Sequence, residues 1–70
     1  MIKFVPIIHK FQSHIDTRVG WQTNIHIGDQ VEVEERWDGL WNIKVNDVPT
    51  GYAIDNFSIN QMAGSILVGA

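Results

Sequence analysis

Apolar and polar residues alternate through the middle of the chain, between residues 30 and 46. In the first half of this stretch valines alternate with glutamates, and in the second half apolar residues alternate with asparagine and lysine. The apolar positions are Val31, Val33, Trp41, Ile43 and Val45. Because neighbouring side chains of a strand point to opposite faces, this period of two predicts two strands that each bury one face. The strands flank Trp37-Asp38-Gly39, which predicts an antiparallel hairpin.

The register of the predicted hairpin follows from keeping the apolar side chains on one face. A two-residue loop at residues 38–39 would place each valine opposite a polar residue, which alternation penalises. A three-residue loop at residues 37–39 instead pairs Val33 with Ile43 and keeps the apolar face continuous. Gly39 then occupies the loop position that needs a left-handed backbone, which glycine adopts without steric cost. We therefore predict the three-residue loop.

The N-terminal half shows weaker strand signals. The apolar residues at 4–8 indicate a strand that Pro6 interrupts, and a proline within a strand favours a sheet edge. Ile25 and Ile27 alternate with polar residues and indicate a further strand, which the turn residues Gly28-Asp29 end.

The C-terminal half continues with turns and shorter apolar segments. Turn residues stand at 46–47 and 49–51, and a short strand is expected at 52–54. The pattern allows one short 3₁₀ or helical turn near residues 55–64. The apolar tail at 62–70 is either a last strand or a contact with a partner. We therefore expect an all-β fold of about five short strands.

Composition indicates one small folded domain, residues 1–70, that relies on apolar packing. The apolar fraction is 44%, and there is no cysteine to form a disulfide or a Cys-based zinc site. The net charge is −3 and the five Lys and Arg residues are scattered, which argues against nucleic-acid binding. No segment has the roughly 18 apolar residues of a membrane span. The start of the chain also lacks a signal-peptide cleavage motif, so we expect no membrane association and a cytoplasmic location.

Residues 28–57 resemble the second half of an SH3 domain in the order and spacing of their motifs. That family has a Gly-Asp before a strand, an aromatic-led strand, a tight turn, and a Gly-aromatic step toward a short 3₁₀ turn. The matching segments are Gly28-Asp29, the strand from Trp41, Asn46-Asp47, Gly51-Tyr52 and Asp55-Asn56-Phe57. The resemblance implies a small SH3-like barrel.

The residues that form the peptide groove of eukaryotic SH3 domains are mostly replaced. Leu40 stands in place of the groove Trp, Ile54 in place of its Pro, and Phe57 in place of its Tyr. Asn56 matches the family, but recognition of ordinary PxxP peptides is not expected. Residues 15–20 are similar to the opening of bacterial SH3 domains, so the bacterial type is closer. It implies, as an alternative, binding of cell-wall peptide or glycan.

Candidate catalytic and metal-binding residues lie close together at residues 9–16. His9 and His14 are followed by Asp16, but no third ligand stands at a motif distance, so we expect no metal site. Ser13 and His14 are adjacent, and adjacent residues of a strand point to opposite faces, which argues against a catalytic triad. We therefore expect no enzymatic activity and no cofactor.

Trp21 and Trp37 fall outside the alternating pattern and are the main candidates for a binding surface. Tryptophan is common at interface hot spots, where it fills well-packed pockets. The alternative for Trp37 is that it folds back and caps the core. Glu35 and Asp38 are either solvated charges or border the surface and favour a basic partner. The expected surface consists of Trp21, Glu35, Trp37, Asp38, Leu40, Asp55, Asn56 and Phe57.

The expected function is therefore the binding of another protein or peptide. A chain of this size also resembles small phage or mobile-element proteins that block a host protein. A structural subunit of a larger assembly is a further alternative. In that case the apolar termini, residues 6–8 and 66–68, would form a homo-oligomer instead of pairing as edge strands.

Overall fold

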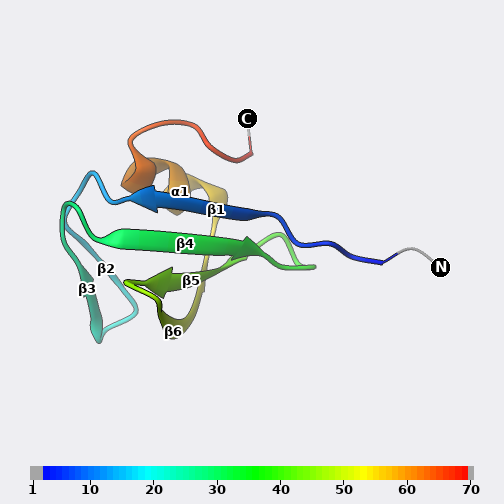
Figure 1. The fold of residues 1–70 in the computed structure, drawn as a ribbon, viewed down its shortest axis with the longest axis horizontal. Coiled ribbons are helices and arrows are strands. Elements are labelled where there is room, and N and C mark those ends of the chain that lie inside the picture. Colours follow the sequence, from blue (N-terminus) through cyan, green and yellow to red (C-terminus); the bar gives the residue numbers. More distant parts are fainter. Residues whose placement is uncertain (1–2, 70) are drawn as a thin grey trace.

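The computed structural model describes residues 3–69, which form six strands and one helix (Figure 1). The elements are β1 (Ile8–Gln12), β2 (Thr17–Val19), β3 (Thr23–Ile25), β4 (Gln30–Glu35), β5 (Trp41–Val45), β6 (Val48–Ile54) and α1 (Asn56–Ala63). One antiparallel sheet has the strand order β1-β4-β5-β6, and β2 pairs with β3 in a second sheet. The all-β prediction is confirmed, with six strands in place of about five.

The predicted register of the β4–β5 hairpin is confirmed. Val33 lies opposite Ile43, so that the apolar side chains of both strands share one face. The Arg36 N–H donates to the Leu40 carbonyl at 2.9 Å and closes a three-residue loop. Gly39 has a φ of +85°, which is the left-handed conformation that this loop requires.

The turn between β5 and β6 is shorter than predicted. Asn46 and Asp47 both have positive φ, of 50° and 67°, as expected for a two-residue hairpin turn. The predicted turn at residues 49–51 is wrong, because these residues lie inside β6. The register of β5 with β6 shifts at this point, and the Thr50 hydroxyl donates to the Ile43 carbonyl at 2.9 Å. A β-bulge therefore accommodates the turn-forming residues within the strand.

β1 lies at the edge of the larger sheet, as Pro6 indicates. The strand begins only at Ile8, later than the apolar pattern suggested. Residues 3–6 extend away from the body of the molecule, beyond the start of β1 (Figure 1). The first half of the predicted strand is therefore an N-terminal arm rather than part of the sheet.

The strand predicted to contain both Ile25 and Ile27 is shorter than expected. β3 ends at Ile25, which is fully buried, whereas Ile27 is 65% exposed. The backbone leaves the strand because side chains hold the following turn: Asp16 accepts the Ile27 N–H, and Asp29 accepts the His26 N–H, both at 2.9 Å. Carboxylates commonly fix turns in this way.

The short helical turn expected near residues 55–64 is present as the α-helix α1. Asp55 caps its N-terminus by accepting the Ser58 N–H at 2.9 Å. Gly64 follows the helix with a φ of +71°, a conformation that ends helices and favours glycine. The residues that fold into this helix are therefore bounded by a capping residue and a glycine, although their apolar period is weak.

The C-terminal tail packs against α1 without forming a strand within residues 64–69. The Asn60 amide donates to the Val68 carbonyl, and its oxygen accepts the Leu67 N–H, both at 2.8 Å. Val68 is buried in the core as a result. The alternative that the tail forms a last strand is wrong for the described residues, and Ala70 lies outside them.

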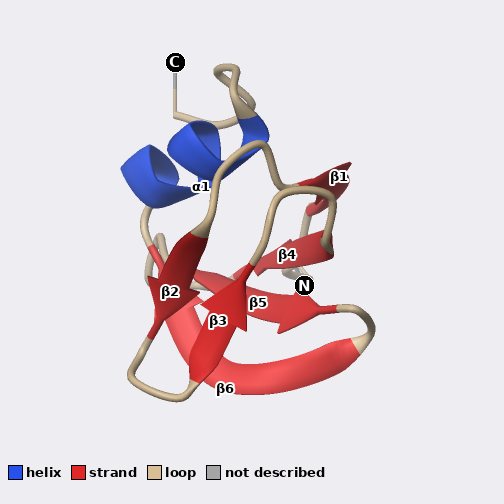
Figure 2. Ribbon diagram, turned by 90° about the vertical axis from the view of Figure 1, so that its left-hand side faces the viewer, coloured by secondary structure: helices blue, strands red, loops and turns tan. Residues whose placement is uncertain are grey.

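The core lies where the larger sheet, the β2–β3 sheet and α1 meet (Figure 2). Its fully buried side chains are Ile25, Val31, Val33, Ile43 and Ile59. Trp41 is buried among them, as its place in the alternating pattern predicts. No helix within residues 3–69 is long and apolar enough to cross a membrane.

Candidate functional site

At one end of the larger sheet, four residues from neighbouring segments lie side by side in one row: Ile7, Glu35, Trp41 and Ile54. The Glu35 N–H donates to the Ile7 carbonyl at 2.8 Å. Glu35 lies opposite Trp41 across β4 and β5, and Trp41 lies opposite Ile54 across β5 and β6. The segments that continue beyond this row, namely the N-terminal arm, the β4–β5 loop and the start of α1, therefore meet at one end of the sheet.

Five large apolar side chains are exposed beyond this row. One of them, Val5, belongs to the N-terminal arm, and we call the other four the aromatic end: Phe4, Trp37, Leu40 and Phe57. Trp37 is the most exposed of them, at 83%. Single apolar residues are ordinary on protein surfaces, whereas several that gather at one place mark an interaction site. The aromatic end is therefore the candidate functional site.

The β4–β5 loop holds Trp37 away from the core. The Asp38 carboxylate accepts the Leu40 N–H at 3.1 Å and forms an ion pair with Arg36 at 2.9 Å. The alternative that Trp37 folds back to cap the core is wrong, because its side chain is exposed. Arg36 offsets the charge of Asp38, whereas Glu35 has no ion pair within the described part of the chain. The β4–β5 hairpin thus carries an exposed indole in its loop and, at the end of β4, a carboxylate without an ion pair among the described residues.

Asn56 joins the aromatic end to the core. Its side-chain oxygen accepts the indole N–H of Trp41 at 2.8 Å. This bond satisfies the polar atom of a buried tryptophan and fixes the start of α1 against β5. Phe57, the next residue, is exposed. Asn56 therefore fixes the start of α1 through Trp41, and Phe57 is the exposed apolar residue beside it.

Asp55 lies at the same end and has a lowered pKa. The Ser58 N–H, which donates to its carboxylate, lowers the pKa from the ordinary value of 3.8 because this bond favours the charged form. A depressed carboxyl pKa contributes stability that is complete above the unfolded-state value and is lost as the pH falls through the folded-state value. Asp55 therefore links the stability of α1 to acid pH.

Replacing Asp55 by asparagine tests this link. Asparagine is as good a helix cap as aspartate, but it does not titrate. We expect Asp55→Asn to lose less stability than the unaltered chain as the pH falls from about 5 to about 2. The measurement is the midpoint of thermal unfolding, by circular dichroism, as a function of pH. Parallel curves for the two proteins would contradict the assignment.

The structure does not bring Trp21 to the other predicted site residues. Trp21 lies in the turn between β2 and β3 and is 80% exposed. In Figure 1 this turn and the β4–β5 loop lie at opposite ends of the molecule. The predicted surface is therefore divided: every residue except Trp21 lies at or beside the aromatic end.

The sequence did not indicate the place of Phe4 in the aromatic end or the role of Arg36 beside it. Phe4 belongs to the N-terminal arm, which the apolar pattern assigned to a strand. Its place follows from Ile7, whose carbonyl extends the pairing of β1 with β4 to the last row of the sheet. Arg36 offsets the charge of the loop, and its position before the hairpin loop is the only signal that could have indicated this role.

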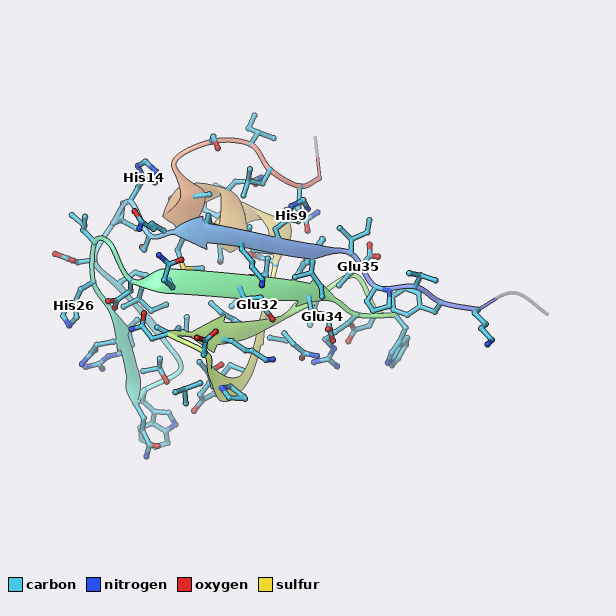
Figure 3. The ribbon with its side chains drawn as sticks, viewed as in Figure 1. His9, His14, His26, Glu32, Glu34 and Glu35 are labelled. Carbon is cyan, nitrogen blue, oxygen red and sulfur yellow. The ribbon has the colours of Figure 1, made fainter. Side chains whose placement is uncertain are left out.

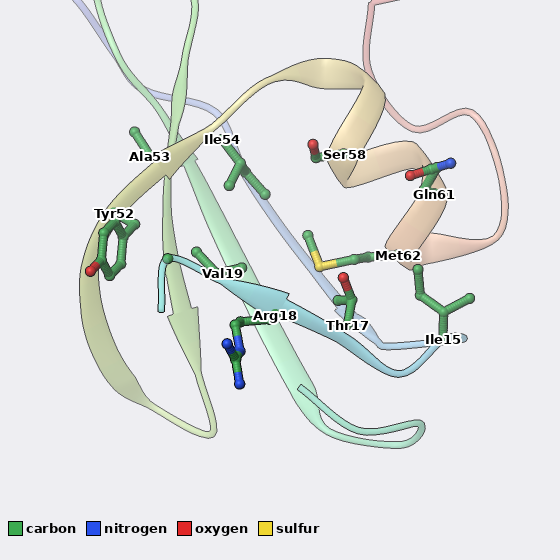
Figure 4. A pocket seen from close by; sticks show the side chains of 11 residues that line it. Ile15, Thr17, Arg18, Val19, Tyr52, Ala53, Ile54, Ser58, Gln61 and Met62 are labelled. Atoms are coloured by element: carbon green, nitrogen blue, oxygen red, sulfur yellow. The ribbon is translucent and has the colours of Figure 1, made fainter. Parts of the chain in front are cut away.

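A small pocket separates β2 from β6 and α1 (Figure 4). Its volume is about 190 Å³, and Val19, Ile54 and Met62 point into it. Arg18, the charged residue of its lining, is engaged by Asn24, whose side-chain oxygen accepts the Arg18 Nε–H at 3.2 Å. The pocket is smaller than the roughly 300 Å³ of common ligand sites.

The three histidines lie apart from one another. Figure 3 shows His9, His14 and His26 on separate parts of the molecule. Within residues 3–69 no group of three or more His, Cys, Asp or Glu side chains could hold a metal ion. Ser13 is buried, and its hydroxyl donates to the Ile15 carbonyl at 2.7 Å. That hydroxyl is therefore used by the backbone.

Comparison with known proteins gives no relative for this arrangement. No family model matches the chain, and no curated protein or solved structure matches it either. The function is therefore argued from the geometry of the aromatic end.

Proposed function

We propose that this chain is a non-enzymatic module that binds another protein through the aromatic end. The observation that carries the proposal is the exposure of Trp37, 83%, on a loop that Arg36 and Asp38 hold in place. Burial of a tryptophan in a partner's pocket typically contributes 2 kcal/mol or more to affinity, as judged by truncation. A fixed loop loses little conformational freedom on binding, which favours affinity further.

The carboxylates at this end favour a basic partner. Glu35 lies opposite Trp41, and Asp55 directly follows Ile54, which also lies opposite Trp41. Neither carboxylate has an ion pair within residues 3–69. Asp38 contributes less, because Arg36 offsets its charge. Complementary charge at an interface increases the association rate and selects among partners.

The same proposal includes an SH3-like barrel as the scaffold. Its support is the order of the elements over residues 28–57: a Gly-Asp turn, two antiparallel hairpins and a helical turn that begins at Asn56. In this scaffold Leu40 and Phe57 occupy groove positions, so the ligand is a protein surface rather than a PxxP peptide.

Two tryptophans of similar exposure allow a matched test. The unaltered chain, Trp37→Ala and Trp21→Ala are each immobilised and used to capture partners from a lysate of the native cells. Captured proteins are identified by mass spectrometry, and the affinity of the purified partner is then measured by calorimetry. We expect Trp37→Ala to bind about 30-fold more weakly, which corresponds to 2 kcal/mol, and Trp21→Ala to bind normally.

The variants must first be shown to fold. Both indoles are exposed, so the unfolding midpoints of the two variants should lie close to that of the unaltered chain. A Trp37→Ala protein that is folded and binds the partner with unchanged affinity would refute the aromatic end as the site.

A further inference from the structure

The outer edge of β1 is unpaired in the described part of the chain. Ile7 accepts a bond from β4, and bonding residues alternate along an antiparallel strand. His9 and Phe11 therefore also bond toward β4, whereas Ile8, Lys10 and Gln12 direct their N–H and C=O groups to the outside. Ile8, Lys10 and Gln12 are exposed, and none of the backbone bonds that the described residues make outside the strands and the helix involves them. The edge is therefore open to a further strand.

The charge along this edge differs from that of the remaining chain. All eight Asp and Glu residues lie at or after Asp16, whereas the preceding segment contains Lys3 and Lys10. The Lys10 side chain is 74% exposed, in the middle of the open edge. A segment that pairs with β1 thus meets positive charge, and negative charge in that segment is favoured.

β4 shows what side chains a neighbour of β1 needs. Val31 and Val33 lie opposite Phe11 and His9, on the core face. Glu32 lies opposite Lys10 on the other face, with 3.6 Å between the carboxylate and the ammonium group. A strand on the outer edge of β1 would meet the same side chains of β1. It should therefore also alternate apolar residues with acidic ones.

A second copy of this chain does not fit that description. Both edges of its β4 are already occupied, by β1 and β5. Pairing of β1 with β1 would bring Lys10 of each copy to the same short edge, and like charges on neighbouring strands are unfavourable. Pro6, which has no N–H, also shortens the edge that two copies could share.

We propose that the outer edge of β1 binds an extended segment of another protein in which apolar and acidic residues alternate. The segment adds an antiparallel strand beside β1, with backbone bonds to Ile8, Lys10 and Gln12 and an acidic residue opposite Lys10. This surface differs from the aromatic end in chemistry, because it uses backbone groups and a positive charge.

The probe for this proposal is a capped synthetic peptide with the sequence of residues 30–35, which is the strand that β1 already accepts. A second peptide carries lysine in place of each glutamate. Binding to the full chain is followed by NMR titration, and hydrogen exchange is measured on the amides of β1. We expect saturable binding of the acidic peptide only, with new protection at Ile8, Lys10 and Gln12 and unchanged protection at His9 and Phe11.

Lys10 and Lys44 provide a matched pair of variants. Each ammonium group lies 3.6 Å from the Glu32 carboxylate, but Lys44 is on β5, away from the open edge. We expect Lys10→Glu to weaken peptide binding by about tenfold or more and Lys44→Glu to weaken it much less. Trp37→Ala should bind the peptide normally. The result of the peptide test is therefore independent of whether the aromatic end binds a partner.

Three results would overturn the proposal. The first is equal binding of the acidic peptide by Lys10→Glu and Lys44→Glu when both are folded. The second is absence of new protection at Ile8, Lys10 and Gln12. The third is a concentration-dependent dimer, seen by ultracentrifugation, together with protection of the same amides from hydrogen exchange in the absence of peptide. That result would assign the edge to a second copy.

Discussion

Replacing Ile25 by alanine is expected to lower the free energy of unfolding by about 2–5 kcal/mol. Ile25 is fully buried and belongs to the cluster that joins β3 to the larger sheet and α1. Truncation removes buried apolar surface and leaves a cavity that close packing cannot fill. A chain of 70 residues has a total stability of about 4–10 kcal/mol, so this change removes a large part of it.

Ile27 provides the control for this substitution. It lies two residues away and has the same side chain, but it is 65% exposed. We expect Ile27→Ala to change the free energy of unfolding by less than about 0.5 kcal/mol. The measurement is urea unfolding followed by circular dichroism. Equal destabilisation by the two substitutions would mean that β3 does not end at Ile25.

Replacing Gly20 by alanine should also strongly destabilise the protein. Gly20 has a φ of +63°, and a Cβ atom there would overlap three ring carbons of Tyr52. The left-handed backbone costs about 1–2 kcal/mol for alanine. Displacing the Tyr52 ring, which packs against the core, adds a cost of about 1–3 kcal/mol.

Comparison with Gly28 separates the cost of the left-handed backbone from the cost of displacing the Tyr52 ring. Its φ is +93°, and no atom lies within 4 Å of a Cβ built there. Gly28→Ala therefore introduces backbone strain without overlap, and it should destabilise the protein less than Gly20→Ala. Urea unfolding of both variants measures the difference. If Gly28→Ala is the more harmful, the contact of Gly20 with Tyr52 is not a packing constraint.

The β4–β5 hairpin could be predicted because its determinants are local. Alternation between Val31 and Val45 places the apolar residues on one face for only one loop length, and Gly39 fits that loop. The burial of Trp41 follows from the same pattern. In these positions the sequence contains the whole physical argument, because the strands pair with their immediate neighbours in the chain.

The errors arose where distant residues decide the conformation. Thr50 lies in a strand because its hydroxyl replaces a backbone donor to Ile43, which no turn propensity reveals. Ile27 leaves the sheet because Asp16, eleven residues earlier, accepts its N–H. Side chains that bond across the chain override the local pattern at both places.

The candidate site was predicted only in part, because hairpin pairing is local whereas the packing of the two sheets is not. Residues of the β4–β5 loop and the start of α1 meet because they flank paired strands, so hairpin register is enough to group them. The distance between Trp21 and Trp37 depends instead on how the β2–β3 sheet packs against the larger one. The contribution of Phe4 depends on the pairing of β1 with β4, which joins segments far apart in the sequence.

The three indoles occupy different surroundings, and this gives the protein its own optical reporters. Trp41 is buried and its N–H is bound by Asn56, whereas Trp21 and Trp37 face water at opposite ends of the molecule. In a variant whose only tryptophan is Trp41, the wavelength of its fluorescence emission would report unfolding. A form that keeps only Trp37 would report occupancy of the aromatic end, and one that keeps only Trp21 would serve as a silent reference.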